Sequence, residues 1–271
     1  MIVVLYLAAV VAAIVFSAVT GEVGTAWTVV VWSPWPGPPP GWSGNGFVPA
    51  LIGSLRAWML WQVLRGPVVR VPRPPQEREA VALRLALYLG VAVNLIPWSQ
   101  GGGLYQEVAS VVSLVVRVAL VVLFALVLTG TLPGFRTVAL ALGVVGVAGA
   151  ALGRVLVPTA TSEGGLGPVP VWLVFEVLGL VRVAWQVMML RGQRGDGRWS
   201  AATVRYGVLD LVAFLALLVV NAVNWRMWNP PIEALALGWV LAALNVFGPI
   251  WWARTAHELA DDRRQRVVAG R

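Results

Sequence analysis

The chain has 271 residues, of which 59% are hydrophobic and only 12% are charged. Soluble domains carry about twice that share of charge, roughly a quarter of their residues, so the composition excludes an ordinary soluble protein and predicts an integral membrane protein. The formal net charge is +8, and every basic residue is arginine. In a membrane protein such charge reports orientation across the bilayer, and we expect no nucleic-acid partner.

The residue types that are missing exclude several kinds of site. Without lysine the chain cannot form a Schiff base with retinal, and without cysteine it has neither disulfides nor thiolate metal sites. The single histidine, His257, argues against bis-histidine haem and catalytic zinc. The sequence also lacks a phosphate-binding loop and an HExxH motif. We therefore expect no cofactor and no metal, and the residues favour a protein that is not an enzyme.

Apolar runs set the expected architecture, because a helix needs about 20 apolar residues to cross a bilayer core. These runs are continuous rather than alternating, which predicts helices. The predicted fold class is an all-α integral membrane protein with eight transmembrane helices. In chain order the runs are 2–20, 47–65, 81–98, 107–130, 137–157, 169–190, 203–225 and 232–253.

The first run and the segment after it differ sharply in character. Residues 2–20 lack a positively charged start and a clear small-residue cleavage site, so we expect a retained span rather than a signal peptide. Residues 27–47, WTVVVWSPWPGPPPGWSGNGF, are too rich in proline for a helix and predict an outer loop. Its tryptophans favour an aromatic belt at the membrane interface, and a stacking surface for an external ligand or subunit is the alternative.

Arginines gather in the connections on one side of the eight predicted spans. The positive-inside rule places that side in the cytoplasm, so both termini, including a basic tail at 256–271, are expected in the cytoplasm of a prokaryotic cell, with the chain in its inner membrane. The clusters are Arg65, Arg70, Arg73 and Arg78; Arg191, Arg194 and Arg198; and Arg254, Arg263, Arg264, Arg266 and Arg271.

An internal repeat emerges when the chain is shifted by 126 or 127 residues. GSLRAWMLWQVLRG at 53–66 aligns with GLVRVAWQVMMLRG at 179–192. Three further landmarks keep the same order, predicting two parallel four-helix units, 1–130 and 131–255, related by a pseudo-two-fold axis along the membrane normal. Parallel repeats of this kind occur in transporters, with the substrate site between the halves. The landmarks are Asn94 with Asn221, Trp98 with Trp225, and Glu107 with Glu233.

Charged residues inside the runs are the candidate functional residues. Arg56 lies nine residues before Arg65, or roughly 13 Å along a helix, and Arg182 lies at the same distance from Arg191. A charge at such depth costs at least about 2.5–3.5 kcal/mol and therefore faces a partner inside the bundle. Asp210, about seven residues into the seventh run, is the predicted ion-pair partner of Arg182.

The other polar residues of the runs give the candidate site its remaining members. Arg117 and Glu176 add a third deep arginine and a second deep acid, and Asn94 and Asn221 add neutral hydrogen-bonding groups. Either these groups pair across helices and only fix packing, or they line a polar cavity with residual positive charge suited to an anionic solute. Contact between the arginines and another protein chain is the third possibility.

Three functions stay open at this point. The first is binding or transport of a small anionic or amphiphilic solute at the interface of the repeats, with Arg56 and Arg182 as binding or gating charges and Asp210 orienting Arg182. The second is a non-catalytic membrane subunit that scaffolds a larger complex. The third is a lipid-modifying enzyme that uses Glu176, Asp210 and arginines. The expected partners are membrane lipids, a small anionic solute and other membrane subunits.

Overall fold

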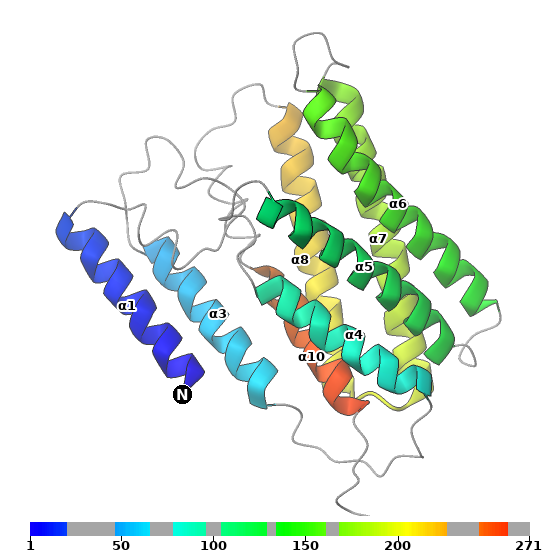
Figure 1. The fold of residues 1–271 in the computed structure, drawn as a ribbon, viewed down its shortest axis with the longest axis horizontal. Coiled ribbons are helices and arrows are strands. Elements are labelled where there is room, and N and C mark those ends of the chain that lie inside the picture. The colour runs from blue at the N-terminus through cyan, green and yellow to red at the C-terminus, as the bar shows by residue number, and fades with distance from the viewer. Residues whose placement is uncertain are drawn as a thin grey trace, which may run out of the picture.

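The computed structural model describes residues 1–20, 47–65, 78–95, 104–128, 134–160, 168–226 and 244–259. Within these ranges every regular element is a helix, as Figure 1 shows, which confirms the expected helical class. The elements are α1 (Ile2–Thr20), α3 (Phe47–Arg65), α4 (Arg78–Leu95), α5 (Leu104–Val127), α6 (Phe135–Ala160), α7 (Pro168–Asp196), α8 (Ala201–Arg226), the 3-10 helix η2 (Leu244–Val246) and α10 (Phe247–Glu258).

The first seven apolar runs each correspond to one of these helices. Of the eighth run, 232–253, only the second part is described, and there α10 continues to Glu258. Three described helices are long and apolar enough to cross a membrane, which identifies a membrane-embedded protein: Ile2–Thr20, Ser110–Val127 and Ala201–Val220. The predicted outer loop, as far as residue 46, and the tail beyond residue 259 lie outside the described residues.

The core lies where α4, α5, α7 and α10 meet. At its centre the ring of Phe124 on α5 stacks on Trp251 of α10, with centroids 6.3 Å apart, and meets Trp185 of α7 edge-on at 5.9 Å. A second apolar cluster joins α3 to α10 through Met59 and Ile250. In Figure 1, α1 and α3 lie side by side at the N-terminal edge, so α3 connects α1 to the rest of the bundle.

Two glycines of α6 allow close contacts with neighbouring helices. A Cβ on Gly143 would collide with Val121 of α5, and a Cβ on Gly149 would collide with Leu178 of α7. Gly146, between them, has more room, since its nearest neighbour, Val181, is 3.8 Å from the position of a Cβ. Close approach of backbones strengthens helix packing in lipid, where the hydrophobic effect does not drive association.

We expect Gly143→Ala to lower the free energy of unfolding by about 1–3 kcal/mol, because the stiff Val121 side chain must shift to admit the methyl group. Gly146→Ala should be neutral or stabilising by up to about 1 kcal/mol, since alanine is the better helix former. The free energies of unfolding of both variants can be compared by denaturing each in detergent and monitoring the loss of helix by circular dichroism. Equal stabilities would contradict the tight α5–α6 contact at Gly143.

Candidate functional site

Arg182 lies at the middle of α7, fourteen residues from either end of the helix, or about 21 Å. Its side chain is half-buried, and its guanidinium carbon lies 4.0 Å from the centre of the Phe214 ring on α8. A cation over an aromatic face gains up to about 2 kcal/mol when both are desolvated. The contact holds the cation against α8.

Asp210 on α8 is buried, but Arg182 is not its hydrogen-bond partner. The carboxylate accepts a hydrogen bond from Nε2 of Gln186 at 2.9 Å, and the same nitrogen lies 3.1 Å from the carbonyl oxygen of Gly207. The charges of Arg182 and Asp210 are close enough to attract each other. The predicted pairing of Arg182 with Asp210 is thus an attraction between charges on adjacent helices, and the hydrogen bond to the carboxylate comes from Gln186, one turn along α7 from Arg182.

Two donors on this part of α7 have no acceptor among the described residues. Nε1 of Trp185 is the buried side-chain nitrogen that has no hydrogen-bond partner among the described residues. Within the same part of the chain, the guanidinium of Arg182 has the Phe214 ring and the charge of Asp210, but no hydrogen bond. Residues three apart lie on the same helix face, so the two side chains leave α7 from one side, Arg182 toward Phe214 of α8 and Trp185 toward Phe124 of α5.

Arg56 on α3 has separate surroundings. Its half-buried side chain forms a hydrogen bond with Tyr6 of α1, so it joins the first two helices to each other. Arg182 interacts with α8 instead. The structure therefore does not bring Arg56 and Arg182 together, and Arg182 on α7 is the centre of the candidate site.

The remaining predicted site residues do not gather around Arg182. Arg117 has an exposed side chain on α5, away from Arg182 on α7. The amide of Asn94 donates a hydrogen bond of 2.8 Å to the carbonyl oxygen of Gly90 in its own helix. Glu176 and Asn221 belong to α7 and α8, but their side chains lie outside the described structure.

A polar network at the end of the bundle was not foreseen from the sequence. The buried carboxylate of Glu258, at the end of α10, accepts hydrogen bonds from the backbone N–H of Ser200 at 2.8 Å, the Ser200 hydroxyl at 2.6 Å and the Thr203 hydroxyl at 2.8 Å. Ser200 directly precedes α8, and its oxygen accepts from the N–H of Thr203 as an N-cap does. The serine–threonine spacing was the available sequence signal for this cap.

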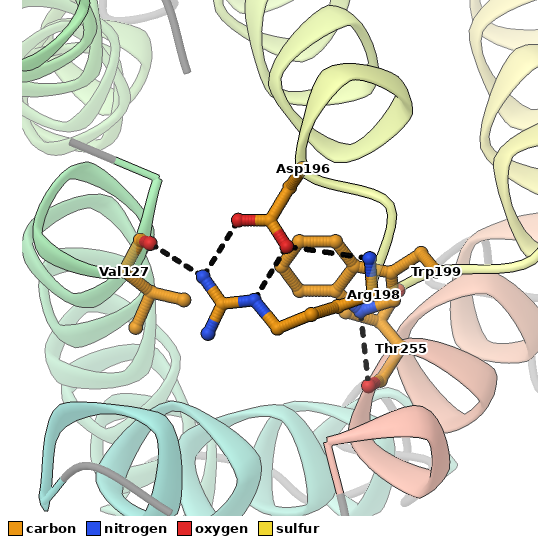
Figure 2. Close-up of polar contacts among 5 residues, drawn as sticks. All are labelled: Val127, Asp196, Arg198, Trp199 and Thr255. Carbon is orange, nitrogen blue, oxygen red and sulfur yellow. Dashed lines mark hydrogen bonds and ion pairs between the residues drawn. The ribbon is translucent and has the colours of Figure 1, made fainter. Parts of the chain in front are cut away.

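The turn between α7 and α8 continues the network, as Figure 2 shows. Arg198 donates to the carboxylate of Asp196 and, at 2.8 Å, to the carbonyl oxygen of Val127 at the end of α5. The indole of Trp199 donates to the carbonyl oxygen of Thr255 on α10 at 3.3 Å. These contacts fasten α5, α8 and α10 to one another, and they explain Arg198 as a structural residue.

The described residues hold no group of three or more metal-ligating side chains. Comparison of the chain with protein families, with curated proteins and with solved structures finds no match. What the arrangement offers chemically is two donors three residues apart on α7, at Arg182 and Trp185, and a nearby carboxylate that is already hydrogen-bonded to Gln186.

Proposed function

We propose that the protein binds a small anionic or amphiphilic solute in the membrane, and that an oxygen of this solute accepts hydrogen bonds from Arg182 and Trp185. The observation that carries the proposal is a pair of donors, three residues apart on one face of α7, without an acceptor among the described residues. A buried donor left unpaired costs about 1–3 kcal/mol. An oxygen between the two side chains would offset that cost for both.

The polar residues near Arg182 and Trp185 determine which ligands this site can bind. The negative charge of Asp210 attracts Arg182, and Gln186 holds that carboxylate in place. Asp210 therefore orients the guanidinium and partly neutralises it, so a ligand meets a moderate rather than a full positive charge. Moderate binding suits transport, because a solute that binds too tightly cannot leave.

The proposal extends to eight spans built as two parallel units, 1–130 and 131–255. A pair of contacts supports the repeat: Met59 and Ile250 share one cluster, and a shift of 126 residues converts them into Trp185 and Phe124, which also touch. A two-fold axis would exchange the two contacts in this way. It would run between α5 and α10, where Phe124 stacks on Trp251.

In such an arrangement the solute site lies at the interface of the units, because Trp185 of the second unit touches Phe124, on the last helix of the first. The equivalent place in the first unit has Met59 where the second has Trp185, and its arginine already bonds to Tyr6. We therefore propose one solute site per chain. Arginine-rich connections favour cytoplasmic termini and a prokaryotic inner membrane.

The test is purification without added ligand, followed by mass spectrometry of everything that co-purifies. Wild-type protein should retain one anionic or amphiphilic molecule, and Arg182→Leu should lose at least about nine-tenths of it, because charged hydrogen bonds are worth about 1.5–3 kcal/mol. Arg194→Leu, which changes an exposed arginine on the same helix, is the matched control. Equal retention by both variants would contradict a role for Arg182.

The scaffold subunit is the second candidate, and α1 is the feature that favours it. This helix packs mainly on α3 and leaves an open apolar groove along its outer side, lined by Val4, Leu7, Val11, Val15 and Val19. Lipid tails cover such a surface equally well. The same mass spectrometry separates the two functions, since a scaffold retains another membrane protein in fixed ratio and no small molecule.

A further inference from the structure

Arg182 leaves α7 on the inner face of that helix. Successive helix residues are turned by about 100°, and the exposed residues of α7 nearest to Arg182 therefore lie on the opposite face. These residues are Leu180, Ala184 and Arg191. Gln186, which shares the face of Arg182, is buried. Arg182 itself is only half-buried, so part of its surface stays accessible on the side of α7 that faces the bundle rather than the lipid.

The ring of Phe214 restricts how a ligand can approach Arg182. The guanidinium carbon lies 4.0 Å from the centre of the ring, so the ring covers one face of the planar guanidinium. The N–H groups of arginine point outward in the plane of that group. A ligand must therefore meet the edge of the guanidinium, where a planar carboxylate accepts two parallel hydrogen bonds.

A group with two oxygens also suits the directions of the two donors. Arg182 extends toward α8 and Trp185 toward α5, and three residues along a helix correspond to a rise of about 4.5 Å. One carboxylate oxygen can accept from both side chains while the second oxygen completes the pair of hydrogen bonds on the guanidinium. A ligand with a single oxygen would leave one of these N–H groups without an acceptor.

The charges at the site favour a ligand with a single negative charge. Among the described residues, Asp210 is the charged group that acts on Arg182, and Arg182 is the charged group that acts on Asp210. A monoanion then leaves one negative charge in excess, and a dianion leaves two. Because charges interact more strongly inside a protein than in water, the second excess charge is costly. A carboxylate therefore fits better than a phosphate or sulfate dianion.

Close helix contacts on both sides of the site limit the size of the ligand. One turn toward the start of α7, a Cβ on Gly179 would lie 2.7 Å from Leu218 of α8. About two turns in the other direction, a Cβ on Gly207 of α8 would collide with Leu190 of α7. A long acyl chain needs a continuous path, and these contacts close the seam between α7 and α8 at both places. A compact apolar body beside Phe214 fits between them.

We propose that the solute of this site is a compact monocarboxylate, whose carboxylate binds Arg182 and Trp185 and whose apolar body packs beside Phe214. This inference rests on the proposed function and narrows it from anionic and amphiphilic solutes in general to one chemical class. The edge of the guanidinium selects the planar carboxylate, the balance of charge selects the monoanion, and the closed seam between α7 and α8 selects a short body.

The experiment compares small probes that each differ from benzoate in one property. Full-length wild-type protein in nanodiscs is dialysed against isotope-labelled probes in mildly alkaline buffer. Benzoate should bind at least about tenfold more tightly than benzamide, which lacks the charge, and than phenylphosphonate, which carries a second charge. Oleate, added to the nanodiscs, should not displace benzoate, because its chain cannot pass the closed seam. This comparison does not depend on the folding of any variant.

Two variants connect the binding of benzoate to the site. Arg182→Leu should weaken it at least about tenfold, because hydrogen bonds to a charged group are lost. Phe214→Leu keeps an apolar side chain but removes the ring that holds the guanidinium, so it should weaken binding about threefold. Phe16→Leu, at an exposed phenylalanine of α1, is the matched control and should leave the affinity unchanged.

Three results with the probes would overturn the inference. Equal affinity for benzamide would show that the charge is not read, tighter binding of phenylphosphonate would assign the site to dianions, and displacement by oleate would assign it to lipids. Failure of the proposed function looks different. If benzoate does not bind but the co-purified molecule still depends on Arg182, the proposed function stands and the monocarboxylate is wrong. If neither depends on Arg182, both are wrong.

Discussion

Replacing Glu258 by alanine is expected to lower the free energy of unfolding by about 4 kcal/mol, because the change leaves three donors, two of them on the partly buried Ser200, without their acceptor. The loss acts at the start of α8, where the N–H of Ser200 has the carboxylate as its partner. It also releases the end of α10, which the same carboxylate ties to α8. Chemical denaturation of the detergent-solubilised protein measures the change.

Two further variants locate the effect. Glu258→Gln keeps one acceptor oxygen but presents an amide nitrogen to the donors around it, so it should lose about half as much stability. Glu79→Ala, which changes an exposed acid in the first turn of α4, should cost no more than about 0.5 kcal/mol. Should Glu258→Ala unfold at the same denaturant concentration as Glu79→Ala, the Glu258 network contributes nothing to the fold.

Arg182→Leu is expected to destabilise the protein by about 3 kcal/mol, because Asp210 then remains charged and buried without a nearby cation. The double variant Arg182→Leu/Asp210→Leu should recover most of that loss, since apolar residues of similar volume replace buried charges at little cost. A double-mutant cycle of unfolding free energies measures the coupling. Additive losses of unfolding free energy would show that the two residues do not interact.

The same double variant separates folding from binding. Its recovered stability should not restore retention of the solute, because the guanidinium that donates to the ligand oxygen is absent. If Arg182 had only a structural role, the result would differ. The stable double variant would then retain the same amount of solute as the wild-type protein. The comparison needs no knowledge of the solute's identity, only its amount per protein chain.

The positions of the helices could be predicted because the bilayer imposes them. A spanning helix needs a long apolar run, and each of the first seven runs, from 2–20 to 203–225, coincides with a described helix. The close approaches at Gly143 and Gly149 follow from the same physics, since small residues allow helices to pack in lipid. These features depend on local sequence alone.

The direction in which each polar side chain points could not be predicted. Helix α5 has a polar side, on which Ser110, Ser113 and Arg117 follow at spacings of three and four residues, but hydropathy does not show whether that side faces the bundle interior or outward. Gln186, rather than Arg182, donates the hydrogen bond to the carboxylate of Asp210. The amide of Gln186 can do so because it reaches both that carboxylate and the carbonyl oxygen of Gly207. Such choices depend on the distance and rotation between helices, which hydropathy does not report.

The polar network at Glu258 escaped sequence reasoning for a related reason. Its members come from two segments more than fifty residues apart, Ser200 to Thr203 and Thr255 to Glu258. In the sequence, Glu258 looks like a solvated charge in a basic tail. Only the antiparallel packing of α10 against α8 turns it into a buried acceptor.

Trp185→Phe tests the solute site most directly, because it removes the indole N–H and keeps an aromatic ring against Phe124. Native mass spectrometry of the purified variant counts the bound molecules per chain. We expect unfolding stability equal to or slightly above that of wild type, since an unpaired donor is gone, together with about tenfold weaker retention of the solute. Retention equal to that of wild type, at unchanged stability, would contradict hydrogen bonding between Trp185 and a ligand and remove the basis of the proposed function.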